Sequence, residues 1–185
     1  MRGLIMLCCF AILLFGCSHT SVGPSPNAPA NTAMYKLAYV NSLAGSYGKG
    51  LQLVIVENGT GGVNTDGTSE EWLYAYVATS TPHATYWFHA NEGGVAYDST
   101  GAALPGMGII NQTWFNSDSA LAVAEKNGGS QFRTQNPHCI IMAALGEAVV
   151  PNPKAFWYVS YYSTDNKTVF VQINVDASSG EVFVL

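Results

Sequence analysis

The sequence predicts an α+β protein made of two tandem repeats, in each of which a helix packs on one face of an antiparallel meander. Short runs in which apolar and polar residues alternate are bounded by turn residues, as in antiparallel strands. Two groups of such runs match each other 85 positions apart. A third feature is a helix-like segment at 117–129 that starts with cap-type residues and ends at a glycine pair.

The match between the two groups starts at two tryptophans. Trp72 opens the run Trp-Leu-Tyr-Ala-Tyr, and Trp157 opens Trp-Tyr-Val-Ser-Tyr. Each run leads through a polar turn into a second apolar strand, at 85–90 or 169–175, and then through a glycine-containing turn into a short final strand, at 95–97 or 181–185. We therefore expect one three-stranded meander per repeat, with the first repeat at 34–104 and the second at 105–185.

Each meander needs a helix to cover its apolar face. The candidates are residues 33–43 for the first repeat and 117–129 for the second. Between helix and meander, the apolar stretches 51–56 and 139–145 indicate one further strand per repeat. The predicted order in each repeat is therefore helix, strand, meander.

Alternation assigns side chains to the two faces of the sheet, because neighbours along a strand point to opposite sides. Val169, Val171, Ile173 and Val175 form an apolar row that we expect to face the core, together with Trp72 and Trp157. The opposite face then carries the aromatic or histidine side chains of a predicted partner-binding surface: Trp87, His89, Tyr158, Tyr162 and Phe170. The alternative is that this face is buried, repeat against repeat or under the loop 101–116 with Trp114 and Phe115.

The overall composition suits a folded domain with a hydrophobic core. Hydrophobic residues make up 48% of the 185 residues and charged residues 10%, with a formal net charge of −5. Lys and Arg do not cluster anywhere in the sequence. Because phosphate binding depends on such clusters, we expect no nucleic-acid partner.

The N-terminus has the pattern of an export signal. Arg2 precedes an apolar run at 4–14 that is too short to span a bilayer, and the run ends in Leu14-Phe15-Gly16-Cys17. This ending resembles the lipobox of bacterial lipoproteins, which implies a signal peptide at 1–16, lipidation of Cys17 and anchoring to a membrane. A Pro-rich, polar tether at 17–33 would follow. The alternative is an ordinary cleaved signal or a short anchor, with Cys17 incidental.

The second repeat contains a distinctive set of residues on its last strands and turns: Trp157, Val159, Val171, Ile173, Val175, Asp176, Ala177, Gly180, Glu181 and Val182. With this set it resembles the PepSY and PepSY-like domains of secreted bacterial proteins. The resemblance is good over 117–185 and weak over 34–98, where Asn-Glu-Gly-Gly at 91–94 replaces the Asp-Ala-x-x-Gly pattern. Two such units would be similar in plan to the β-lactamase-inhibitor-like fold. The resemblance implies an extracytoplasmic domain that binds proteins or peptides, in some relatives as a protease inhibitor.

Little in the sequence indicates catalysis or a cofactor. His138 and Cys139 are neighbours on a predicted strand and so point to opposite faces, and the Glu70-Glu71 pair has no third carboxylate placed against it. We therefore expect no catalytic residue, no metal and no cofactor. The sequence predicts a membrane-tethered module of the bacterial envelope, at the outer membrane or cell surface, that binds a protein or peptide and could modulate a secreted enzyme. The alternatives are a structural envelope lipoprotein without a discrete ligand and an envelope hydrolase acting through Cys139 or the acids.

Overall fold

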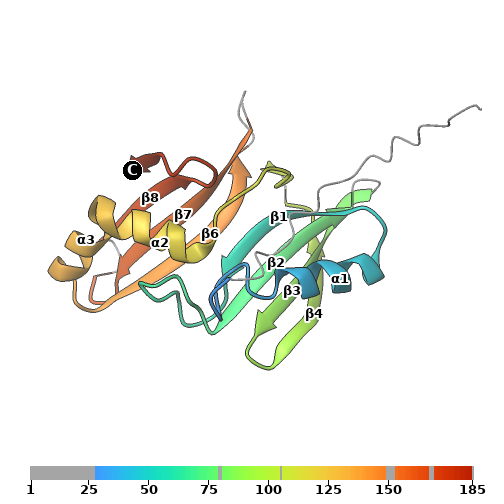
Figure 1. Cartoon of the computed structure of the whole chain (residues 1–185), viewed down its shortest axis with the longest axis horizontal. Helices are drawn as coiled ribbons and strands as arrows, with labels where there is room; N and C mark the ends of the chain where they lie inside the picture. The colour runs from blue at the N-terminus through green and yellow to red at the C-terminus, as the bar shows by residue number, and fades with distance from the viewer. Residues whose placement is uncertain (1–27, 79–80, 105, 149–152, 167–168, 185) are drawn as a thin grey trace, which may run out of the picture.

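The computed structural model describes residues 28–78, 81–104, 106–148, 153–166 and 169–184. It shows an antiparallel sheet with helical segments on one face (Figure 1). The α+β class predicted from the sequence is therefore confirmed. The first half of the chain comprises α1 (Leu37–Tyr47), β1 (Leu51–Asn58), β2 (Glu71–Ala78), β3 (Thr81–Asn91) and β4 (Gly94–Ala102). After β5 (Met107–Gly108), the second half comprises α2 (Ser117–Ala124), α3 (Ser130–Gln135), β6 (Cys139–Ala148), β7 (Lys154–Ser163), β8 (Phe170–Asp176) and β9 (Val182–Val184).

The strands of the two halves form one continuous sheet. Their order is β4-β3-β2-β1-β6-β7-β8-β9, and β5 pairs with β6 beside this path. The halves join where β1 pairs antiparallel with β6, from Ile55 opposite Gly146 to Glu57 opposite Ala144. The sequence predicted the strands but not this joint, because residues far apart in the chain form it.

The core lies between the sheet and the helices. Val56 pairs with Tyr74 on one side and Leu145 on the other, and Leu145 pairs with Trp157. Residues paired across antiparallel strands point to the same face, and these four are fully buried. The helices bury their apolar side chains in the same core cluster: Leu37, Val40 and Ala44 from α1, and Ala120, Leu121 and Ala124 from α2.

Two tryptophans tie the sheet to the segments that precede the helices. The Trp72 indole N–H donates to the Asn31 carbonyl at 2.8 Å, and the Trp157 indole N–H donates to the Phe115 carbonyl at 2.9 Å. Both side chains are almost completely buried. A buried indole N–H needs such a partner, and here each bond fixes the start of a helical segment on the sheet.

The starts of the two helical segments also bind each other. The Asn116 side-chain carbonyl accepts from the Ser117 backbone N–H as an N-cap and from the Met34 N–H at 2.9 Å. The Ser117 hydroxyl accepts from the Ala33 N–H at 3.0 Å. Thr32 is 1% exposed. The packed part of the chain therefore includes the last residues of the segment that the sequence indicated as tether.

The helix predicted at 117–129 is interrupted where the glycine pair stands. Gly128 has φ of 125°, which favours glycine, and the chain then continues into α3, which the sequence pattern did not predict. Gly129 lies against Tyr161, since a Cβ atom there would be 2.2 Å from the Tyr161 hydroxyl. The helical segment therefore turns at the glycines and continues across the sheet.

One predicted core residue is exposed. The prediction that Val169 faces the core is wrong, because β8 begins only at Phe170 and Val169 is 37% exposed in the preceding turn. Ile173 and Val175 are fully buried as predicted. Residues 79–80 of the predicted turn, Lys167 and the segment 1–27, which includes Cys17, lie outside the described residues.

Candidate binding surface

The sheet face opposite the helices, here called the open face, carries a row of side chains that crosses both halves. From β3 to β6, strand pairing places His89 opposite Leu73, Leu73 opposite Glu57, and Glu57 opposite Ala144. The same row continues in the second half through Tyr158, Asn174 and Phe183. The open face is therefore one surface and not two separate ones.

Large apolar side chains are exposed on the second half of the open face. Tyr162 pairs with both Ile140 and Phe170, and its ring stacks on the Phe170 ring with the centroids 5.8 Å apart. Exposed apolar groups that gather in this way are typical of interaction surfaces. We call the following four residues the apolar patch: Ile140 (44% exposed), Met142 (37%), Tyr162 (39%) and Phe170 (57%). Phe183 (45% exposed) lies apart from them on β9, where its ring meets that of Phe156.

The structure brings two of the five predicted binding residues, Tyr162 and Phe170, into contact. Tyr158 and Tyr162 lie on β7 and Phe170 on the neighbouring β8, all on the open face. Trp87 and His89 lie on β3, four strand spacings or roughly 19 Å away from β7, and both are half-buried. All five share a face, but Trp87, His89 and Tyr158 are not part of the apolar patch.

The loop between the two halves does not cover the apolar patch. Trp114 is 3% exposed and its ring meets that of Trp157, 5.9 Å between centroids, on the helix side of the sheet. Phe115 packs against the same core. On the open face, Met107 from β5 lies over Gly146 at the far end of β6. The alternative that Trp114 and Phe115 bury the aromatic face is therefore wrong.

Sequence reasoning missed four residues of the open face. Ile140 and Met142 alternate on β6 with the buried Ile141 and Ala143, so their alternation could have revealed them. Phe183 could have been found in the same way from the short strand that follows Gly180. Glu57 had no such signal, because its position depends on the pairing between β1 and β6.

The helix side carries a polar network around Glu125. Arg133 contacts the Glu125 carboxylate with its Nε and Nη2 atoms, the latter at 2.6 Å, and the Tyr161 hydroxyl donates to the same carboxylate at 3.0 Å. Burial, and then the negative charge of Glu125, raises the pKa of Tyr161. These contacts fix the kinked helical segment on β7.

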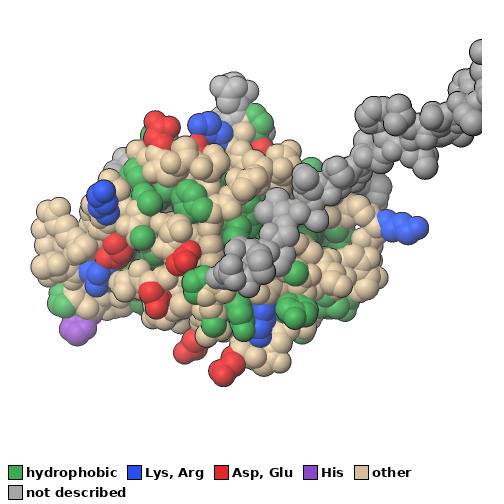
Figure 2. Space-filling view, viewed as in Figure 1, with side chains coloured by type: hydrophobic (Ala, Val, Ile, Leu, Met, Phe, Trp, Pro, Cys, Tyr) green, Lys and Arg blue, Asp and Glu red, His purple; other side chains and the backbone are tan. Residues whose placement is uncertain are grey.

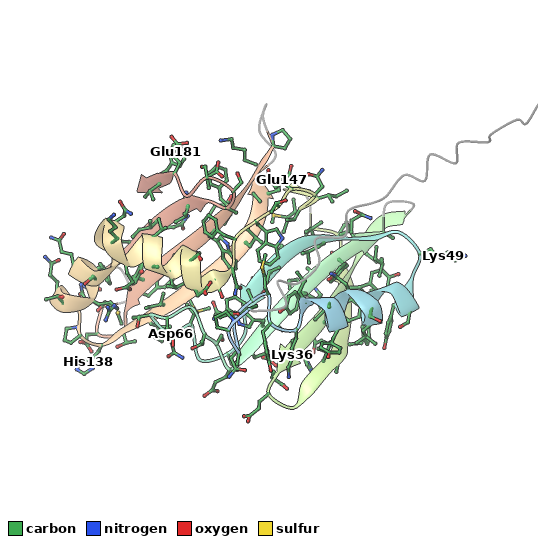
Figure 3. The ribbon with its side chains drawn as sticks, viewed as in Figure 1. Lys36, Lys49, Asp66, His138, Glu147 and Glu181 are labelled. Carbon is green, nitrogen blue, oxygen red and sulfur yellow. The ribbon has the colours of Figure 1, made fainter. Side chains whose placement is uncertain are left out.

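The surroundings of the Cys139 thiol raise its pKa above the ordinary value. Burial raises its pKa, the Arg133 charge lowers it and the Glu125 charge raises it again, so that the net shift is upward. A raised pKa keeps the thiol protonated at neutral pH and therefore a poor nucleophile. Figure 3 shows His138 at the end of β6 opposite to Glu147, so these two groups lie far apart.

On the side seen in Figure 2, Lys and Arg side chains lie apart from one another and form no basic patch. No group of three or more His, Cys, Asp or Glu side chains in the described ranges has the geometry to hold a metal ion. Within the same ranges, every helix is too short or too polar to cross a bilayer.

Comparison with known proteins adds no relationship to this picture. No protein-family model, curated protein or solved structure matches the chain.

Proposed function

We propose that this protein is a membrane-tethered module of the bacterial envelope that binds a protein or peptide through the open face of its sheet. The observation that carries the proposal is the apolar patch, in which Tyr162 and Phe170 stack on each other in contact with solvent. Aromatic side chains stabilise an interface strongly when a partner removes them from water. When they stay exposed, they lower the solubility of the protein. A role as an inhibitor or modulator of a secreted enzyme fits such a surface.

The tether is the second part of the proposal. The apolar run at 4–14 and the lipobox-like ending at Cys17 support export and lipidation, and residues 18–27 are polar and rich in proline. A lipidated Cys17 would tether the folded domain to a membrane, at the outer membrane or cell surface. Mass spectrometry of the extracted protein tests this part, because lipidation adds acyl chains to an N-terminal Cys17, and Cys17→Ala should abolish them.

We also propose that the fold consists of two related PepSY-like units placed side by side. The equivalent hydrogen bonds of Trp72 and Trp157 support it, as does the strand order, which runs outward in both directions from β1 and β6. Each unit would contribute four strands and one helical segment. The joined sheet would then offer a partner a wider surface than one unit could.

Capture from the native envelope tests the binding function. The full chain, immobilised in detergent, should retain a discrete partner, and Tyr162→Ala with Phe170→Ala should reduce that capture at least about tenfold, as expected for loss of central aromatic contacts. Tyr39→Ala serves as the matched control, because Tyr39 is 71% exposed on α1. Equal capture by all three proteins, with unchanged melting temperatures, would contradict binding through the open face.

A further inference from the structure

Glu57 is a negative charge in the middle of the open face. It lies on β1, the central strand of the sheet, between Leu73 on β2 and Ala144 on β6. Among the described residues, none donates a hydrogen bond to its carboxylate or forms an ion pair with it. Partial burial raises the pKa of this carboxyl above its ordinary value. A carboxylate that is half-desolvated and without a donor gains from any cation brought to it.

A second carboxylate lies next to it on the same face. Glu71 on β2 lies two residues before Leu73, and its carboxylate folds over Gly59, two residues beyond Glu57 on the chain. Gly59 makes this possible, since a Cβ there would be 2.4 Å from a Glu71 carboxylate oxygen. The described residues give the Glu71 carboxylate no donor either. The two side chains make the centre of the face acidic.

No Lys or Arg side chain among the described residues of the open face is free to neutralise them. Within the described strands, Lys154 is the one Lys or Arg that points to this side, and it is already paired with Asp176 at 2.9 Å. The described Lys36, Lys49, Lys126 and Arg133 belong to the helical segments and their connections. A second copy that bound about a two-fold axis through the centre of the face would set Glu57 and Glu71 against the same acids. The charge of the face therefore favours a different, basic partner.

The side chains around Glu57 indicate which groups should flank the basic residue of a partner. Tyr158 lies in the same row, and the apolar patch begins on the adjacent β6 with Met142, next to Ala144. We infer that the open face recognises a protein segment in which a Lys or Arg, held by Glu57 with Glu71 beside it, is flanked by apolar side chains that cover the patch. This inference rests on the proposed binding function and specifies the chemistry of its partner.

Panning of displayed random peptides against the full chain in detergent tests this inference. Wild-type protein should enrich peptides with a Lys or Arg between apolar residues. Glu57→Gln, which keeps size and removes charge, should lose the preference for the basic residue and should bind a selected peptide about tenfold more weakly. Glu181→Gln is the matched control, since it removes one charge from an exposed turn and should behave as wild type.

The outcomes separate the inference from the function on which it rests. If selected peptides lack a basic residue, or Glu57→Gln keeps the preference, the inference is overturned while peptide binding stands. If no peptide is enriched, or enrichment survives Phe170→Ala with Tyr162→Ala, binding through the open face is itself overturned. Self-association of the full chain through residue 170, detected by crosslinking, would replace the basic peptide by a second copy.

Discussion

The rings of Trp72 and Trp157 meet edge to face at the centre of the core, with 6.1 Å between their centroids. One ring belongs to the first half of the chain and the other to the second. Because each indole also holds the start of a helical segment, contact between the rings connects both halves to one core. The two halves should therefore unfold together.

Replacement of either tryptophan should destabilise the whole protein. Trp157→Ala or Trp72→Ala removes a large buried side chain and leaves a cavity, at a cost of about 3–5 kcal/mol in the free energy of unfolding. Urea denaturation followed by circular dichroism should give a single transition for each variant, shifted to lower urea. Tyr39→Ala, at an exposed position, should change little. Two separated transitions would show that the halves are independent.

The joint between β1 and β6 should depend on the side chain of Asn58. Its carbonyl oxygen accepts from the Ala143 backbone N–H at 2.7 Å, and its amide donates to the Gly59 carbonyl. Asn58→Ala leaves a buried N–H without a partner and should cost about 1–3 kcal/mol in chemical denaturation. Asn64→Ala, at an exposed turn, should cost less than about 0.5 kcal/mol. Equal effects would contradict a special role for Asn58.

Two glycines with positive φ should respond differently to alanine. Gly67 has φ of 81° and a Cβ there would be 2.4 Å from the Asp118 backbone, whereas Gly61 has φ of 89° with nothing within 4 Å. Gly61→Ala should cost about 1–2 kcal/mol from backbone strain alone. Gly67→Ala should cost clearly more, because the loop must also move away from α2. Thermal melts of both variants measure the difference, and equal costs would contradict the close packing.

Asp176 should make stability sensitive to acid. Burial by itself raises its pKa, but hydrogen bonds from Lys154, Ser178 and Ser179 outweigh burial and hold the pKa well below its ordinary value. A lowered pKa stabilises the fold above the unfolded-state value of about 3.9, and this contribution is lost as the pH falls below it.

Asp176→Asn should therefore lower the free energy of unfolding by about 1–3 kcal/mol at pH 7. The difference from wild type should shrink progressively below about pH 4. Denaturation at several pH values measures it, with the exposed Asp165→Asn as control. A difference that stays constant down to acid pH would show that the charge of Asp176 contributes nothing.

Sequence patterns within a few residues predicted the main strands, whereas pairing between distant strands determined how the two halves are joined. Alternation and turn residues were sufficient for the strands that contain Trp72 and Trp157, because those signals lie within a few residues. The β1–β6 joint, and with it the central position of Glu57, depends on residues that are nearly ninety positions apart in the chain. Alternation also identified Tyr162 and Phe170 on the open face. It did not show that Trp87 lies four strands away from β7, the strand of Tyr162.

Crosslinking in intact cells tests most directly whether the open face is a binding surface. A photo-reactive phenylalanine analogue can replace Phe170 on the open face or Tyr39 on the helix side of the full chain. We expect a discrete crosslinked product from position 170 and none from position 39. Products from position 39 alone, or from neither position in cells that contain the folded protein, would contradict binding through the open face.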